Sequence, residues 1–211
     1  MMEIKIWSDV RCPFCYIGKR KLEAALEQFP QRDQVEITWK SFQLDPSLET
    51  QTDINVIDYF VETKGVTAEQ ARQMLGGATQ MAGEMGLGFD LEKGILANSF
   101  NAHRLIQMAK SKGLGDEIEE ALFKAQFETH QNIDDPQVLI SAAVSTGMEE
   151  AEVKEMLDSD AFAYEVKQDE LEARNIGVRG VPFFVFDDRY AVSGAQPVEV
   201  FLQTLEKALD N

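Results

Sequence analysis

The stretch SDVRCPFCYIGKRKLE, residues 8–23, contains both cysteines of this 211-residue chain, Cys12 and Cys15. Before it, apolar and polar side chains alternate, as in a strand; after it, apolar side chains recur about every 3.6 residues, as in a helix. Proline is favoured at the first position of a helix because its missing N–H group costs nothing there. Pro13 therefore predicts a helix start, with Cys12 at the N-cap.

Both ends of the chain predict strands. Residues 34–44, QVEITWKSFQL, alternate through Val35, Ile37 and Trp39, which completes a right-handed βαβ unit with two parallel strands. Residues 181–194, VPFFVFDDRYAVSG, predict two short strands joined by a hairpin turn at Asp187-Asp188. A last helix follows, with one apolar face formed by Val198, Phe201, Leu202, Leu205 and Leu209. The two ends therefore predict one mixed sheet, built from a βαβ and a ββα unit.

Between these ends, residues 53–175 repeat at helical spacing almost throughout. Apolar stripes are formed by Ala102, Leu105, Ile106 and Ala109, and by Ile118, Ala121, Leu122 and Ala125. Asp135-Pro136 predicts the start of a further helix. Four or more helices in series predict a bundle-like unit. We therefore predict a discontinuous α/β domain, residues 1–45 and 162–211, interrupted by an all-helical insertion, residues 46–161.

The composition excludes several classes of partner. The formal net charge of −17 repels phosphate backbones and anionic lipids, so we expect no nucleic-acid and no membrane partner. The N-terminal residues carry charges at Glu3 and Lys5 and lack the apolar core of a secretory signal. No window approaches the roughly 18 apolar residues of a membrane span. We therefore expect a cytoplasmic location, where thiols are kept reduced and a permanent structural disulfide is unexpected.

Two cysteines separated by two residues, near a βαβ unit, are typical of a thioredoxin-like redox motif. A helix N-terminus carries unpaired N–H groups and about half a positive charge, and both favour a thiolate at Cys12. The thiolate is the reactive form. We expect Cys12, at an exposed cap, to attack a substrate disulfide. Cys15, one turn further into the helix, would then resolve the mixed disulfide.

Three other uses of the cysteines stay open on the residues alone. A structural disulfide would close so short a loop that it restricts the unfolded chain little. Zinc needs four ligands as a rule, and His103 and His130 lie far away on predicted helices, so we expect no metal. The cysteines could also be inert core residues. We expect both histidines to be helix residues with satisfied hydrogen bonds. Sequence alone favours a trans bond before Pro182, at the start of a strand.

Three separated motifs, which occur in the same order as in a known family, resemble that family. Residues 8–23, NSFNAHRLIQMAK at 98–110, and GVRGVPFFVF at 177–186 followed by VSGAQP at 192–197 are similar to the DsbA-family thioredoxin-like oxidoreductases. The likeness spans nearly the whole chain. It is closest to the FrnE-like branch, which is related to 2-hydroxychromene-2-carboxylate isomerases and kappa-class glutathione transferases.

The resemblance implies a thioredoxin-like fold with a helical insertion, a nucleophilic Cys12 and a resolving Cys15. It also implies a cis Val181-Pro182 bond that faces the pair, with Val181 offering backbone hydrogen bonds to a substrate. We expect Pro13 and Phe14, between the cysteines, to contact substrates too. Glutathione-using relatives hold the γ-glutamyl end of glutathione at positions that correspond to Gly194, Ala195 and Gln196. Those relatives usually have serine in place of Cys12, and this chain departs from them by keeping both cysteines.

These observations favour a thiol–disulfide oxidoreductase or protein disulfide isomerase that acts on protein or small-molecule thiols and disulfides. We expect no bound cofactor, with glutathione as a possible co-substrate, and a monomer or a homodimer. A glutathione-dependent isomerase or transferase is the first alternative. A redox-sensing binding module is the second.

Overall fold

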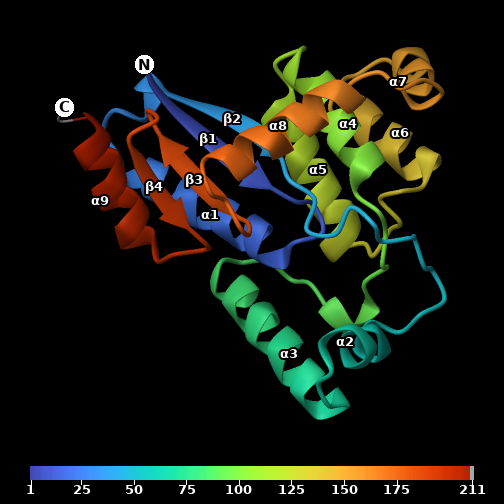
Figure 1. Ribbon diagram of the computed structural model, residues 1–211. Helices are drawn as coiled ribbons and strands as arrows, with labels where there is room; N and C mark the ends of the chain where they lie inside the picture. Colours follow the sequence, from blue (N-terminus) through green and yellow to red (C-terminus); the bar gives the residue numbers. More distant parts are fainter. Residues whose placement is uncertain (210–211) are drawn as a thin grey trace.

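The computed structural model describes residues 1–209 and contains a four-stranded mixed sheet in the order β2-β1-β3-β4 (Figure 1). The strands are β1 (Met2–Ser8), β2 (Val35–Ser41), β3 (Phe183–Phe186) and β4 (Tyr190–Ser193). β1 is parallel to β2 and antiparallel to β3, and β3 is antiparallel to β4. Both ends of the chain therefore contribute to one sheet, as the sequence predicts.

One face of the sheet packs against α1 (Pro13–Gln28) and α9 (Val198–Leu209), which also contact each other. Ile4 and Ile6 are fully buried in this core, and the rings of Phe184 and Phe201 meet edge to face with their centroids 4.8 Å apart. The α9 face differs from its prediction at one end. Leu209 is exposed because the helix turns Ala208 toward the core in its place.

The opposite face of the sheet is covered by α8 (Ala163–Asn175), which lies along β2 (Figure 1). Trp7, Ala173 and Val178 form a second buried cluster there. The indole N–H of Trp7 donates a hydrogen bond to the carbonyl oxygen of Asp169, 3.0 Å away. Because helices cover both faces, β1 is buried more completely at its end than a simple alternation predicts.

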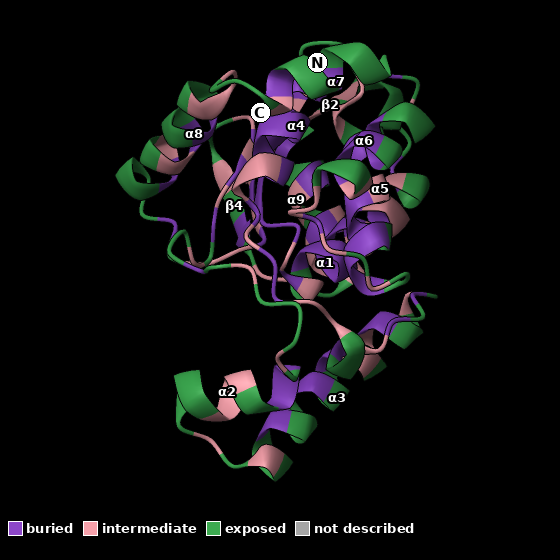
Figure 2. Ribbon diagram, turned by 90° about the vertical axis from the view of Figure 1, so that its right-hand side faces the viewer, coloured by how far each residue is buried: buried purple, intermediate pink, exposed green. Residues whose placement is uncertain are grey.

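The segment between β2 and β3 is helical, which confirms the predicted insertion. In chain order it contains α2 (Val56–Lys64), α3 (Ala68–Glu84), α4 (Phe100–Lys110), α5 (Gly115–Phe127), α6 (Pro136–Ser145) and α7 (Glu150–Leu157), followed by α8. Short 3-10 helices lie at Arg32–Gln34 and Leu91–Lys93. Figure 2 shows α2 and α3 projecting from the rest of the molecule, with the buried side of α3 turned inward. Asp135 caps α6 and Pro136 is its first residue, as predicted.

The hairpin between β3 and β4 turns at the predicted residues. Asp187 and Asp188 both have positive φ angles, 48° and 54°, which is the backbone of a type I′ turn and suits the twist of paired strands. The turn is also tied to β1. The N–H group of Glu3 donates to the Asp187 carboxylate at 2.7 Å, and the Lys5 ammonium lies 2.8 Å from Asp188.

None of the helices within residues 1–209 combines the length and the apolar character that crossing a membrane would require.

Candidate active site

The two cysteines lie at the start of α1, as predicted. Cys12 is the N-cap and Pro13 is the first helical residue. The Cys12 N–H group donates to the carbonyl oxygen of Asp9 at 2.8 Å, and the Cys15 N–H group donates to the carbonyl oxygen of Cys12 at 3.0 Å. Both thiols are free. Cys15 therefore lies in the first turn of the helix, and Cys12 lies at its N-cap.

The prediction that Cys12 is exposed was wrong, since its exposed fraction is only 5%, against 1% for Cys15. The reason is a loop from the other end of the chain, which the local pattern around residue 12 does not reveal. The Cys12 sulfur lies 3.6 Å from the carbonyl oxygen of Val181. Phe14, between the cysteines, is the exposed side chain of this turn, with an exposed fraction of 39%.

The loop over Cys12 contains a cis peptide bond between Val181 and Pro182. Sequence statistics favour a trans bond, whereas the resemblance implies the cis form. Pro182 is buried, and its carbonyl oxygen accepts a hydrogen bond from the Gly194 N–H group at 2.8 Å. This bond brings Gly194, Ala195 and Gln196 next to the proline loop.

The loop of residues 194–196 also contacts α1. The Lys21 ammonium donates to the carbonyl oxygen of Ala195 at 3.0 Å, and the Gln196 side chain donates to the carbonyl oxygen of Ser193 at 2.8 Å. Gly194 has a φ of +80°, which favours glycine. The structure therefore assembles Cys12, Val181, Pro182 and this loop at one end of the sheet.

Gly18 is a residue of this region that the sequence analysis missed. A Cβ atom at this position would lie 3.0 Å from Cγ of Pro182 and 3.1 Å from Cζ of Phe184. The absence of a side chain lets α1 approach the proline loop closely. A glycine inside a predicted helix was the only available signal, because such a glycine often marks a packing requirement.

Beneath the cysteine turn lies a fully buried carboxylate, Asp9. Its two oxygens accept hydrogen bonds from the N–H groups of Arg11, at 3.2 Å, and Leu44, at 2.8 Å. Nε2 of His103, on α4, lies 3.5 Å from it. Burial alone would raise the pKa of Asp9, but His103, the Leu44 N–H group and the Arg11 charge lower it overall. Burial likewise opposes protonation of His103, and Asp9 outweighs it, so the pKa of His103 is raised.

Both histidine predictions need correction. His103 lies on a helix, but neither of its ring nitrogens makes a hydrogen bond to any of residues 1–209, because its contact with Asp9 is a longer ion pair. His130 lies outside a helix. α5 ends at Phe127, and His130 has a φ of +51° in the following loop.

A second buried carboxyl group, that of Glu119, lies against the end of β1. The Ser8 hydroxyl, at the end of β1, donates to Oε1 of Glu119 on α5 at 2.6 Å. Burial raises the pKa of Glu119 to about 7. Burial also raises the pKa of the Cys15 thiol well above its usual value, and the neighbouring Cys12 side chain raises it further. The apolar stripe predicted for this helix does not include Glu119, and a polar residue outside such a stripe is expected to face solvent. The sequence analysis therefore missed it.

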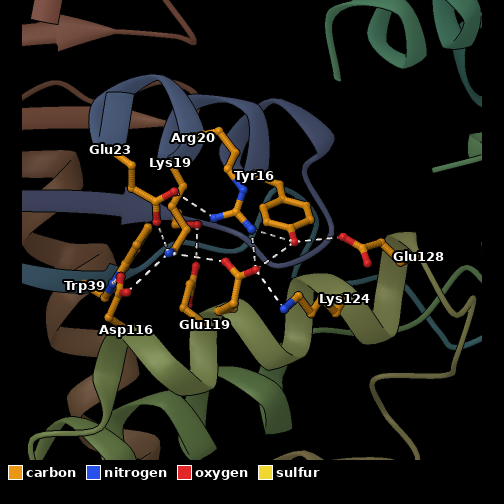
Figure 3. Close-up of polar contacts among 11 residues, drawn as sticks. Tyr16, Lys19, Arg20, Glu23, Trp39, Asp116, Glu119, Lys124 and Glu128 are labelled. Atoms are coloured by element: carbon orange, nitrogen blue, oxygen red, sulfur yellow. Dashed lines mark hydrogen bonds and ion pairs between the residues drawn. The ribbon is translucent and has the colours of Figure 1, made fainter. Parts of the chain in front are cut away.

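A charged network fixes α1 against α5 (Figure 3). Lys19 is buried and pairs with Glu23, with Asp116 at 3.2 Å and with Glu120 at 3.3 Å. Arg20 pairs with Glu120 and lies 2.7 Å from Glu23. Burial opposes ionisation of Glu120, but Arg20 and Lys19 lower its pKa to about 2. The hydroxyl of Tyr16, the residue after Cys15, also donates to Glu120, at 2.9 Å.

No group of three or more His, Cys, Asp or Glu side chains suited to a metal ion is found within residues 1–209.

Residues 3–206 match the family described as DSBA-like thioredoxin domain. The chain belongs to this family. Among solved structures of the family, a probable DsbA oxidoreductase from Streptomyces coelicolor is 37% identical, with a TM-score of 0.94 over 100% of this chain and 91% of that chain. The DSBA-like fold accounts for both the mixed sheet and its helical insertion.

A second solved structure matches at lower identity, and a curated relative matches over a short stretch only. The cytosolic disulfide reductase DsbM from Pseudomonas aeruginosa shares the fold, with a TM-score of 0.68 and 16% identity over 99% of this chain and 98% of that chain. The uncharacterized protein YwbO from Bacillus subtilis is 42% identical over 52 residues, which are 25% of this chain. That match spans only 24% of the length of YwbO.

Proposed function

We propose that this protein is a thiol–disulfide oxidoreductase that exchanges disulfides through Cys12 and Cys15. The observation that carries the proposal is the relative position of the two cysteines. Cys12 caps α1, and Cys15 lies in the first turn of the helix, where its N–H group donates to the carbonyl oxygen of Cys12 at 3.0 Å. The N–H groups and partial positive charge of the helix start stabilise a thiolate at the cap. Membership of the DSBA-like family supports the same chemistry.

The reaction consists of two exchanges. The Cys12 thiolate attacks one sulfur of a substrate disulfide, and the other substrate sulfur leaves as a thiolate. The Cys15 thiolate then attacks the Cys12 sulfur, a Cys12–Cys15 disulfide forms, and the second substrate sulfur leaves. The substrate gains two electrons and the protein loses two. The same steps in reverse oxidise a substrate dithiol, and the two directions together isomerise disulfides.

Backbone groups of Val181 support binding of an extended substrate segment beside Cys12. Within residues 1–209 the Val181 N–H group has no hydrogen-bond partner, and its carbonyl oxygen makes only the sulfur contact of 3.6 Å. A peptide can pair with both groups as a neighbouring strand does. Its approach displaces the weak contact between Cys12 and Val181, which opens the sulfur to attack.

The side chains around the turn favour peptide substrates. Phe14 and Leu44 are apolar and have exposed fractions of 39% and 49%. Leu44 is held near the turn because its N–H group donates to the Asp9 side chain. Large exposed apolar side chains beside a reactive group provide contact area for a protein partner. We propose a cytoplasmic location, and the fold shared with a cytosolic disulfide reductase is consistent with it.

The two single-cysteine variants test this proposal. Wild type is expected to reduce insulin and to refold scrambled ribonuclease in the presence of glutathione. Cys15→Ser is expected to accumulate a mixed disulfide with a peptide disulfide, visible by non-reducing electrophoresis, and Cys12→Ser to accumulate none. Equal trapping by both variants would refute the assigned roles. A biological activity that survives Cys12→Ser would favour a redox-sensing binding module.

Glutathione is a second candidate ligand because the loop of Gly194, Ala195 and Gln196 adjoins Pro182. We propose it as a co-substrate that regenerates the dithiol, while a glutathione-dependent isomerase or transferase is the rival enzyme class. Glutathione conjugation to an electrophile separates the two. The rival predicts conjugation that persists in Cys15→Ser, whereas disulfide exchange predicts no conjugation and requires Cys15 for turnover.

A further inference from the structure

A pocket of about 610 Å³ lies against the segment that follows β2, and the exchange described above does not use it. Its walls come from this segment, from the start of α4 and from the middle of α8, and they include Gln43, Glu49 and Glu170. Its volume is within the range of pockets that bind ligands. The pocket can therefore hold a group that the proposed function leaves unassigned.

Two hydrogen bonds connect the wall of this pocket to the cysteine turn. The Cys12 N–H group donates to the Asp9 carbonyl oxygen at 2.8 Å, and the N–H group of Leu44, which follows a pocket residue, donates to the Asp9 carboxylate at 2.8 Å. Phe42 and Val181 pack against the same buried cluster. An extended chain covers about 3.3 Å per residue, so a substrate paired with Val181 reaches the pocket with a side chain a few residues from its disulfide.

Gln43 is a buried polar side chain that lines the pocket with an unused acceptor. Its exposed fraction is 8%. Its backbone N–H group donates to Oε1 of Glu170 at 3.2 Å, and its Nε2 donates to Oδ1 of Asn98 at 3.3 Å. This assignment of Nε2 is consistent, because Oδ1 of Asn98 also accepts the Phe100 N–H group. Oε1 of Gln43 has no hydrogen-bond partner within residues 1–209, so a donor from a ligand would satisfy it.

The charged side chains that line the pocket are mainly acidic. They are Glu49, Asp134 and Glu170, and within residues 1–209 Lys167 is the one cationic side chain of the lining. Both oxygens of Asp134 already accept side-chain hydrogen bonds, at 2.6 and 3.3 Å. Glu49 has no hydrogen bond or ion pair within residues 1–209, and only Oε1 of Glu170 accepts a hydrogen bond there. Three carboxylates against one ammonium group favour a cationic ligand.

We propose that this pocket binds the side chain of an arginine in a substrate protein whose disulfide, a few residues away, reacts with Cys12. This inference rests on the proposed function and names its substrate class. A guanidinium group presents five N–H donors in a rigid fork that suits carboxylate acceptors. Glu49, the second oxygen of Glu170 and Oε1 of Gln43 supply such acceptors. The net charge of −17 attracts cationic proteins from a distance, and the pocket selects among them by position.

Single-turnover exchange with matched peptides tests this inference. The probe is a symmetrical disulfide of a short peptide with one cysteine among alanine, serine and glycine residues. A neutral, self-quenching fluorescent label on each half makes the fluorescence rise when the disulfide is reduced. Arginine, or citrulline as its neutral counterpart of nearly the same shape, occupies each position near the cysteine in turn. Reduced protein in excess is mixed with each peptide, and the second-order rate constant is measured.

At the favoured position, wild type should react about 10-fold faster with the arginine peptide than with the citrulline peptide, which is the effect of one charge-assisted hydrogen bond. Glu49→Gln changes an exposed side chain and should already lower this ratio, and adding Glu170→Gln should bring it close to 1. Lys167→Gln should increase the ratio because it removes the opposing charge. Glu165→Gln is the matched control, at an exposed position of α8 outside the pocket, and should leave the ratio unchanged.

A ratio near 1 at every position in wild type would overturn the inference. A preference for arginine that persists in the double variant would also overturn it, because the preference would then come from the overall surface charge. Exchange itself still proceeds in both cases, so the proposed function stands. Absence of exchange with every peptide would instead refute the proposed function.

Discussion

Two sides of α1 hold the cysteine turn in different ways. On one side, which we call the Gly18 side, Gly18 faces Pro182 and Phe184 so closely that an added Cβ atom would lie only 3.0 and 3.1 Å from them. On the other, which we call the charged side, Lys19 and Arg20 are held by the carboxylates of α5 and of Glu23 (Figure 3). The same helix thus presents a missing side chain to the sheet and long ionic side chains to the insertion.

The two kinds of contact do not constrain the position of the cysteines equally. Close packing tolerates no added volume, because the neighbouring atoms must move when a group is inserted. Ion pairs between flexible and partly exposed side chains rearrange when one partner is changed, and water solvates the charge that remains. We therefore expect substitutions on the Gly18 side to have larger effects than those on the charged side, except where a charged side chain is fully buried.

The sharpest test is Gly18→Val. Even a Cβ atom at this position would lie 3.0 Å from Pro182, so two further carbons must displace the proline loop. We expect the free energy of unfolding to fall by about 3 kcal/mol, measured by urea denaturation, together with slower exchange at Cys12. Gly77→Ala, at an open position of α3, is the matched control. It should raise stability by up to about 1 kcal/mol, because alanine is the better helix former.

The second test uses the pH dependence of stability at Glu119, the fully buried carboxyl group behind the charged side. Its pKa rises from 4.5 to about 7 on folding, so the folded state holds a proton that the unfolded state has lost. The stabilisation that this group contributes is fully present below about pH 4.5 and is lost as the pH rises through about 7. One pKa unit corresponds to about 1.36 kcal/mol, which gives a total of about 3 kcal/mol at most.

Glu119→Gln should abolish this loss, which is measured as the difference in unfolding free energy between wild type and variant from pH 4 to 8. Asp9 and Glu120 have lowered pKa values, so their stabilisation disappears only as the pH falls below that range, and it cancels in the difference. A difference that does not change with pH would show that folding does not shift the pKa of Glu119.

The third test is Lys19→Met, on the charged side. It keeps the buried stem of the side chain but removes the ammonium group that faces Glu23, Asp116 and Glu120. We expect a loss of about 2 kcal/mol, less than for a fully enclosed pair because Asp116 is half exposed. Adding Asp116→Asn should recover part of this loss in a double-mutant cycle. A loss of unfolding free energy as large as that of Gly18→Val would contradict the expected difference between the Gly18 side and the charged side.

The smallest effect is expected for an ion pair far from α1. Lys154 and Glu150 on α7 are four residues apart and both are more than half exposed. Lys154→Ala should change the unfolding free energy by no more than about 0.5 kcal/mol. Thermal denaturation followed by circular dichroism at low and high salt measures it, and a loss above 1 kcal/mol would contradict the ranking.

Local patterns predicted the local features of this fold well. Pro13 after an alternating segment predicted the strand, the N-cap at Cys12 and the helix, and Asp187-Asp188 predicted the hairpin, because a few neighbouring residues determine each of them. The burial of Cys12 was not predictable in this way. It depends on Val181, 169 positions away, and no periodicity near residue 12 reports that contact.

The same limit applies to the buried polar side chains. Glu119 is separated from Ser8 by 111 positions, and an acidic residue in an amphipathic helix is normally assigned to its solvent-facing side. His103 was expected to have satisfied hydrogen bonds because that is the usual state of a buried polar group. Its position beside Asp9 follows from how α4 packs near the end of β1, which the sequence does not encode locally.

The turn at Asp187-Asp188 has an effect at the far end of its strand. Its bonds to Glu3 fix Phe186 opposite Ile4, and β3 is only four residues long, so that pairing also sets where Val181 and Pro182 come to rest. A slip of one residue would carry the proline loop about 3.3 Å along the sheet and turn Phe184 to the α8 face. The register of the hairpin therefore determines whether the Val181 carbonyl oxygen comes within reach of the Cys12 sulfur.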